Sequence, residues 1–184
     1  MIHIITRCSR PENLYRIYKS IFYKDFFVRW YIIFDTSKSK DYSKFIIDDS
    51  RIEYYYEDIG SYKLGYSLKY NIKGYIYYLD DDNIIHPDLY YNIEKYLNDK
   101  NILVFEQIGN DRTNYELSLE NVIESRVDLA QFMIHSDFLN NDELFSDDSY
   151  FSDSILLEKL KNIYSDKFIF IKKKLSYYNY LKNK

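Results

Sequence analysis

Seven short runs of apolar and aromatic residues recur along the chain, and polar or periodic segments separate them. The runs hold almost no internal polar position, which is typical of strands buried on both faces of a sheet. They cover residues 2–5, 30–34, 52–56, 75–79, 102–105, 131–135 and 168–171. The pattern therefore predicts seven strands in one central sheet.

Three of the segments between these runs predict helices. In residues 11–25 a proline suits the first turn, Ser9 is placed to cap, and four apolar positions share a face: Leu14, Ile17, Tyr18 and Ile21. Segments 61–74 and 86–100 have similar spacing, and Gly74 is placed to end the first of them. Strands that alternate with helices predict a three-layer α/β/α fold with a mostly parallel sheet, in one domain covering residues 1–184.

Polar residues follow several of the predicted strands. Thr6 and Arg7 follow the first, Asp35 follows the second, and Glu57 and Asp58 follow the third. Ligands of parallel α/β sheets bind beyond the carboxyl ends of the strands, so these side chains are expected on one functional rim. The polar segment 109–128 shows no clear period and predicts a long connection of the kind that often covers a substrate.

Three consecutive carboxylates, Asp80 to Asp82, directly follow the fourth run. Adjacent like charges repel, and each carboxylate loses solvation beside a protein wall, so the arrangement needs a counter-charge. Mg²⁺ or Mn²⁺ would provide it, since both ions prefer hard oxygen ligands. In a second interpretation, the aspartates and Asn83 form a solvated turn that caps a helix beginning near Pro87.

Composition narrows the function classes. The chain has 184 residues, of which 46% are hydrophobic and 29% charged, as in ordinary globular proteins. A net charge of -4 argues against binding to nucleic acid, and the basic run 172–174 is typical of a solvated strand end. Cys8 is the single cysteine, so no intramolecular disulfide is expected. The apolar N-terminal run ends at Arg7, which is too short for a signal peptide, and no apolar stretch is long enough to span a bilayer. We therefore expect a cytoplasmic protein without disulfides.

Four motifs in order resemble those of GT-A fold glycosyltransferases of the family 2-like kind. They are IHIITRCSRPENLYRIYKSI (2–21), YIYYLDDDNIIHP (75–87), VDLAQFMIHSDFL (127–139) and SDDSYFSDSILLEKL (146–160). DDDN also resembles the corresponding motif of glucuronosyltransferase-like relatives. KKKLSYYNYL (172–181) resembles the last core strand of GT-A enzymes. The resemblance implies a GT-A nucleotide-diphospho-sugar transferase fold, with a nucleotide-binding half of about residues 1–100 and an acceptor half of about residues 101–184.

The resemblance also implies roles for the acidic residues. Asp82 would ligate Mn²⁺ or Mg²⁺ directly, and Asp80 would support the metal directly or through water. Asp81 would reach the ribose of the donor, and Asp35 would accept hydrogen bonds from its base or ribose. These enzymes often supply a further metal ligand, commonly His, near the end of the core, whereas the final segment here contains none.

The remaining donor contacts come from the first half of the chain. By the same resemblance, Thr6 and Arg7 would line the nucleotide pocket. Arg10 or Lys63 would neutralise the oxygens of the diphosphate, although an exposed helix charge explains either residue equally well.

The acceptor hydroxyl must lose a proton as it attacks, and this requires a general base. Asp148 matches the acidic position of the fourth motif, with Asp147 as its immediate competitor and a plain helix N-cap as the alternative for either. Asp128 is a candidate contact to sugar or acceptor, and it equally suits a cap or a turn.

These expectations describe a metal-dependent, inverting glycosyltransferase that uses a UDP- or GDP-sugar and a carbohydrate or other hydroxyl acceptor. The chain is short for this class, so a partner chain or domain is expected to complete the acceptor site. A non-catalytic module that binds a nucleotide sugar or metal is the alternative. A phosphatase of the haloacid-dehalogenase kind is disfavoured, because Thr6, Arg7 and Cys8 stand where its nucleophilic aspartate is required.

Overall fold

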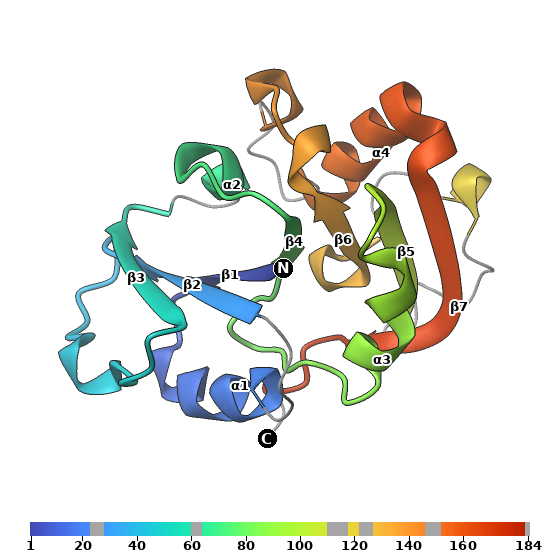
Figure 1. Ribbon diagram of the computed structural model, residues 1–184. Coiled ribbons are helices and arrows are strands. Elements are labelled where there is room, and N and C mark those ends of the chain that lie inside the picture. Colours follow the sequence, from blue (N-terminus) through green and yellow to red (C-terminus); the bar gives the residue numbers. More distant parts are fainter. Residues whose placement is uncertain (23–27, 60–63, 110–117, 122–126, 146–151, 183–184) are drawn as a thin grey trace.

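A seven-stranded sheet runs through the centre of the molecule, with helices on both faces (Figure 1). This computed structural model describes residues 1–22, 28–59, 64–109, 118–121, 127–145 and 152–182. The strands are β1 (Ile2–Cys8), β2 (Val28–Asp35), β3 (Ile52–Glu57), β4 (Tyr75–Tyr78), β5 (Ile102–Ile108), β6 (Phe132–His135) and β7 (Phe168–Tyr177). The α-helices are α1 (Leu14–Ile21), α2 (Tyr66–Lys69), α3 (Leu89–Ile93) and α4 (Ser152–Tyr164).

The strand order is β3-β2-β1-β4-β6-β5-β7. Strands β1 to β4 are parallel to one another, and β5 is parallel to β7. Strand β6 lies between β4 and β5 and is antiparallel to both. All seven strands predicted from the apolar runs are present, and the mostly parallel three-layer fold is confirmed.

The two faces of the sheet bury different side chains. On one face Ile4 and its neighbour Trp30 pack with the apolar residues of α1 and α3. On the other face Ile5 and Ile33 pack with Leu156 and other residues of α2 and α4. Consecutive strand residues point to opposite faces, so a run buried on both sides must be apolar at every position. This is why the strands were readable from the sequence.

The helix predictions hold for the first segment and need correction for the second. A 3₁₀ turn (Pro11–Asn13) leads into α1, whose Leu14 and Ile17 are buried as expected. Helix α2 ends at Lys69, so the prediction that Gly74 ends it is wrong. Gly74 has φ 128° and directly precedes β4, where a Cβ would lie 2.9 Å from the Met1 carbonyl oxygen. The glycine is therefore required for close approach of two backbones.

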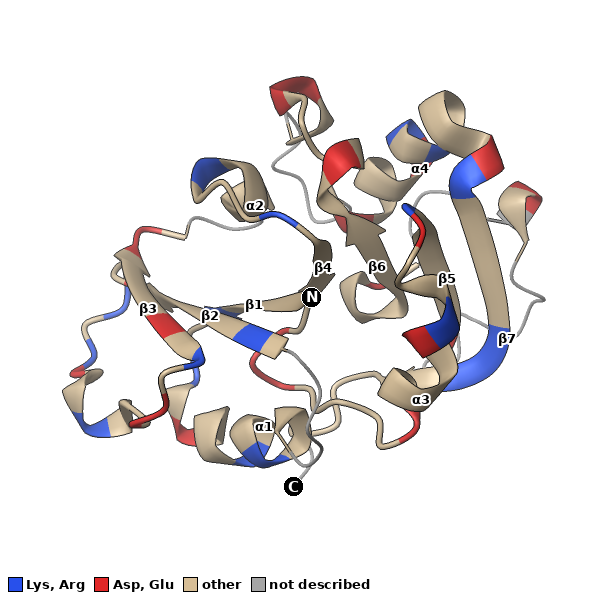
Figure 2. Cartoon of the chain, in the orientation of Figure 1, with Lys and Arg blue, Asp and Glu red and all other residues tan. Residues whose placement is uncertain are grey.

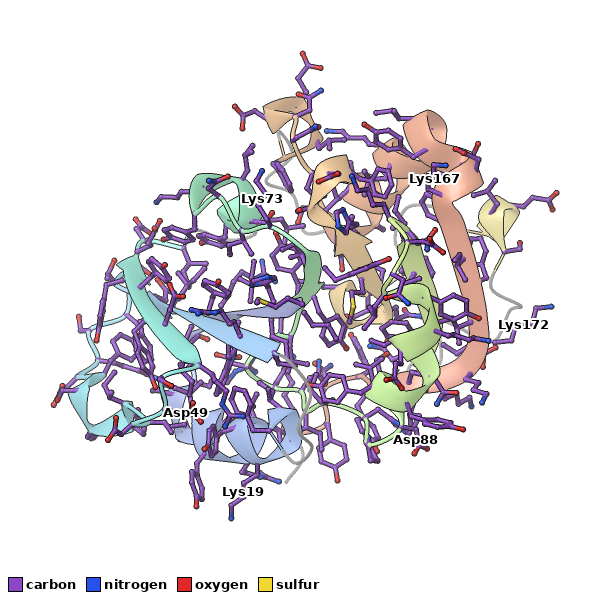
Figure 3. The ribbon with its side chains drawn as sticks, viewed as in Figure 1. Lys19, Asp49, Lys73, Asp88, Lys167 and Lys172 are labelled. Atoms are coloured by element: carbon purple, nitrogen blue, oxygen red, sulfur yellow. The ribbon has the colours of Figure 1, made fainter. Side chains whose placement is uncertain are left out.

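Strand β7 forms one edge of the sheet and carries the basic run on its lower part in Figure 2. Lys172, Lys173 and Lys174 are exposed there, and lysines on an edge strand oppose pairing with a second sheet. Figure 3 labels Lys172 and five further charged residues, of which Lys19, Lys73 and Asp88 are exposed, and Asp49 and Lys167 are partly exposed. In the described part of the chain, no helix has the length and apolar character needed to cross a membrane.

Candidate functional site at the carboxyl ends of the strands

The three consecutive aspartates follow β4 and lie on the rim where the first four strands end. Asp81 is 2% exposed and Asp82 4%, whereas Asp80 is partly exposed. The N-cap of α3 is Asp88, whose side chain makes no capping hydrogen bond. The interpretation of the aspartates as a solvated helix-capping turn is therefore wrong.

Asp81 joins the loop after β4 to the loop after β1. One carboxylate oxygen, Oδ2, accepts hydrogen bonds from the backbone N–H groups of Ser9 at 2.6 Å and Arg10 at 2.7 Å. The other, Oδ1, accepts from Arg10 Nε at 2.7 Å, and the Asp81 carbonyl accepts from Asn13 Nδ2 at 2.8 Å. Ser9 therefore binds Asp81 and does not cap the following helix. The ribose contact predicted for Asp81 stays a prediction.

Each of the other two aspartates also has a cationic partner. Arg7 Nη2 lies 2.9 Å from Asp80 Oδ1. Arg10 Nη2 lies 3.0 Å from Asp82 Oδ2, and Lys182 Nζ lies 3.2 Å from the same oxygen. Burial, together with the nearby negative charge of Asp80, still raises the pKa of Asp82 above its ordinary value. Side chains of this chain thus provide part of the counter-charge that the sequence assigned to a metal ion.

Two further carboxylates lie close enough to Asp80 for its negative charge to raise their pKa values. Burial, and then Asp80, raise the pKa of Asp128 to about 7. Asp128 precedes β6 and accepts hydrogen bonds from Gln107 Nε2 at 2.8 Å and Ala130 N at 3.0 Å. It also forms a capping box with Gln131, so the capping role considered for it is confirmed.

Asp153 is the second of these carboxylates, and the sequence interpretation missed it. It lies in the first turn of α4, where Oδ1 accepts a hydrogen bond from Ser154 N at 2.9 Å. Burial raises its pKa to about 6, with a further rise from Asp80 and an opposing effect from Arg7. Its place at the start of the apolar helix, within the same motif as Asp148, was the available signal.

Thr6 and Asp35, two of the residues predicted to contact the donor, lie in different environments. The Thr6 hydroxyl is fully buried and accepts a hydrogen bond from Trp30 Nε1 at 2.8 Å, so it lies in the core and not on the rim surface. Asp35 is nearly buried at the end of β2, where it accepts hydrogen bonds from the backbone and hydroxyl of Ser37. Lys63, Asp147 and Asp148 lie outside the described residues.

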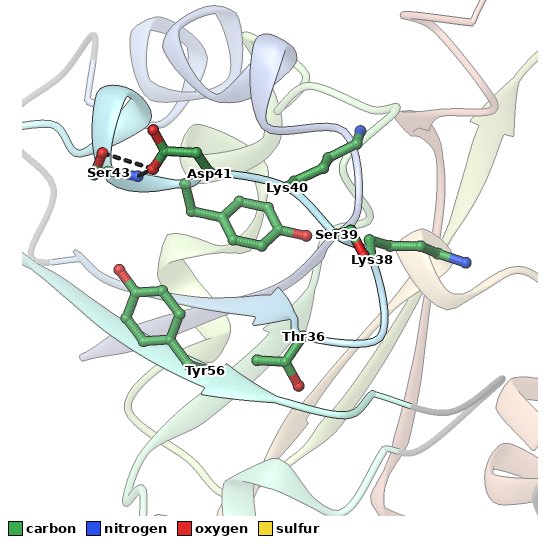
Figure 4. Close-up of a pocket in the computed structure, with 8 residues that line it drawn as sticks. Thr36, Lys38, Ser39, Lys40, Asp41, Ser43 and Tyr56 are labelled. Carbon is green, nitrogen blue, oxygen red and sulfur yellow. Dashed lines mark hydrogen bonds between the residues drawn. The ribbon is translucent and has the colours of Figure 1, made fainter.

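A hollow of about 560 Å³ opens beside the ends of β2 and β3 (Figure 4). The loop after β2 forms most of its lining, and Tyr56 of β3 completes it. Asp41 accepts hydrogen bonds from the backbone and hydroxyl of Ser43 in its wall. Asp35 directly precedes the loop, so the hollow adjoins the rim.

Comparison with known proteins gives a fold and no sequence family. No family model and no curated protein matches this sequence. Among solved structures, TarS 1-349 of S. aureus is similar with a TM-score of 0.69 and 14% identity, covering 96% of this chain and 59% of that one. The same protein in complex with UDP-GlcNAc gives a TM-score of 0.71 at 12% identity, covering 96% and 58%.

A putative glucose-1-phosphate thymidylyltransferase from Bacillus anthracis is also similar, with a TM-score of 0.59 and 13% identity, covering 95% of this chain and 88% of that one. These neighbours and the strand order, with β6 reversed between β4 and β5, agree on one architecture. The fold is of the GT-A type. This GT-A chain spans about three fifths of the length of TarS 1-349.

Proposed function

We propose that this GT-A chain is a glycosyltransferase that moves a sugar from a UDP- or GDP-sugar to an acceptor hydroxyl with inversion. The observation that carries the proposal is the group of Asp80, Asp128 and Asp153 near Arg7, where burial, with a further contribution from Asp80, raises the pKa of both other carboxylates. Carboxylates with raised pKa values at the carboxyl edge of such a sheet suit proton transfer. The UDP-GlcNAc complex of TarS supports a nucleotide-sugar donor.

Asp153 is the general base in this proposal. With a pKa of about 6 it is ionised at neutral pH and remains basic enough to accept the proton of an attacking hydroxyl. Asp128 is less suited, because its Oδ1 already accepts hydrogen bonds from Gln107 and Ala130. Asp148 stays a prediction, and the experiment below separates it from Asp153.

Asp80 and Asp82 fit a hard divalent cation. Within the described residues, Asp80 Oδ2 and Asp82 Oδ1 accept no hydrogen bond, and carboxylate oxygens are the ligands that Mg²⁺ and Mn²⁺ prefer. The described part of the chain contains no group of three His, Cys, Asp or Glu side chains that would hold a metal by itself, so phosphate and water oxygens would complete the coordination. A bound metal would offset negative charge on the departing diphosphate.

The chain's own residues prepare the rest of the donor site. Arg7 holds Asp80 in place, and Arg10 holds both Asp81 and Asp82. Because the chain spans only part of the length of TarS 1-349, a partner chain or further domain would complete the acceptor side.

The proposal is tested with the two candidate bases in parallel. We expect a UDP- or GDP-sugar to raise the melting temperature of the wild-type protein, most strongly with Mn²⁺. Asp153→Asn should keep this rise and lower slow donor hydrolysis or transfer by about 10²-fold or more, because only the proton acceptor is lost. Asp148→Asn is the matched control.

Each other outcome has a distinct meaning. If Asp148→Asn abolishes turnover and Asp153→Asn does not, the base is Asp148. If the wild-type protein binds a nucleotide sugar but turns over none with any acceptor, the non-catalytic module is favoured. If no UDP- or GDP-sugar shifts the melting temperature, the proposed function is wrong.

A further inference from the structure

The segment 178–182 returns from the end of β7 to the aspartate loop. Asn179 adopts a left-handed conformation with φ 51°, which redirects the chain after the strand. Leu181 is then buried in the core on the α1 face of the sheet. Two residues that are distant in sequence, Asp82 and Lys182, are brought together in this way.

Backbone contacts hold the segment in place without the lysine side chain. Leu181 N donates a hydrogen bond to the Asp82 carbonyl at 2.7 Å, and Tyr180 N donates to Asn83 Oδ1 at 3.1 Å. Asn83 is itself 3% exposed, so this anchor is part of the interior. The position of Lys182 is therefore set by the fold, and its ion pair is a consequence of that position.

The ammonium group of Lys182 combines a buried partner with an exposed head. Its side chain is 49% exposed, whereas that of Asp82, at 3.2 Å, is 6% exposed. An ammonium group carries three N–H donors, and Asp82 Oδ2 takes one of them. The remaining donors can serve an anionic oxygen at the same rim.

Arg10 is more fully committed to the aspartates than Lys182 is, because only its Nη1 donors are left over, and its side chain is less exposed, at 35%. Its side chain binds Asp81 through Nε and Nη2 and also reaches Asp82. Arg7 is likewise held by Asp80 and is only 16% exposed. Lys182 is thus more exposed than either arginine.

We propose that Lys182 binds the diphosphate of the nucleotide-sugar donor, and that segment 178–182 positions this lysine beside the aspartate loop for that contact. The inference rests on the proposed function and assigns a residue to it from the far end of the chain. A lysine held on a carboxylate and shared with a phosphate binds as a point charge, which makes the contact independent of the donor's base.

The test compares a nucleoside diphosphate with its nucleoside. UDP with uridine and GDP with guanosine are titrated calorimetrically into wild-type protein and Lys182→Met in the presence of Mn²⁺. We expect Lys182→Met to weaken binding of the diphosphate about tenfold and to leave nucleoside binding unchanged, since only a charged hydrogen bond is lost. Lys182→Arg keeps the charge and should retain most of the affinity.

Lys167→Met is the matched control. Lys167 is 45% exposed and lies 2.9 Å from Asp166, so it resembles Lys182 in exposure and pairing but lies before β7, away from the rim. Its substitution should leave diphosphate affinity unchanged.

Two results would overturn the inference alone. Wild-type affinity for the diphosphate in Lys182→Met, or an equal loss for nucleoside and diphosphate with a lower melting temperature, would mean that Lys182 only secures the segment. If wild-type protein binds neither UDP nor GDP, the proposed function fails as well, so the two failures are distinguishable.

Discussion

Replacing Asp128 with asparagine should stabilise the protein, and only above a defined pH. Burial and the charge of Asp80 raise the pKa of Asp128 from 3.8 to about 7, so the folded state binds a proton more tightly than the unfolded state. The stabilisation that this group contributes to the folded state is therefore fully present below pH 4 and is lost as the pH rises through 7. At about 1.4 kcal/mol per pKa unit the difference is at most about 4 kcal/mol.

The expected gain is smaller than this limit, because Asp128 is partly exposed and solvent screens its charge. We expect Asp128→Asn to raise the free energy of unfolding by about 2 kcal/mol at pH 8 and to leave it unchanged near pH 4. Asparagine has the shape of the protonated acid and keeps the oxygen that accepts from Gln107 and Ala130. The packing is therefore preserved.

Urea unfolding at pH 4 and pH 8 measures both values. Asp137→Asn is the control, because the side chain of Asp137 is exposed and its hydrogen bond with Lys100 lowers its pKa, so no gain at pH 8 is expected. A loss of stability in Asp128→Asn that is equal at the two pH values would refute the reasoning, since it would show that the carboxylate is needed for its hydrogen bonds and carries no charge penalty.

Two further substitutions test the fold and the site. Gly74→Ala should lower the free energy of unfolding by about 1–3 kcal/mol, because φ 128° is strained for alanine and its Cβ would meet the Met1 carbonyl. Gly65→Ala is the control, since its Cβ would meet only ordinary contacts. Equal urea midpoints for the two variants would contradict this prediction. Arg7→Met removes a cation that lowers the pKa of Asp153, so the rising limb of the pH–rate profile should move to higher pH. An unchanged or more acidic limb would exclude the coupling between Arg7 and Asp153.

The strands could be predicted because burial on both faces leaves a local mark at every position. Local chemistry was less informative for Gly74, since a glycine near a predicted helix end suits both a C-cap and a close backbone approach, and only the position of Met1 decides between them. Helix α2 is one turn long, so it has little periodicity to detect.

The candidate site was predictable only where it is contiguous. Asp80 to Asp82 stand together in the sequence, so their charge was noticed at once. Lys182 contacts Asp82, and Asp153 lies near enough to Asp80 for that charge to raise its pKa, but no spacing in the sequence encodes either relation. Thr6 shows the opposite case, because a polar residue at a strand end was assigned to a pocket although its hydroxyl is bonded to Trp30 in the core.

The bonds of Asp81 mean that the three aspartates are not equivalent targets for mutagenesis. This middle carboxylate fastens two loops together through the Ser9 and Arg10 amides, and an asparagine there would turn either its amide nitrogen toward those donors or its oxygen away from Arg10. Loss of activity on changing it would report a displaced rim in addition to any lost contact with the ribose. In a scan of this motif, the middle position would therefore be damaging whether or not its carboxylate meets the substrate.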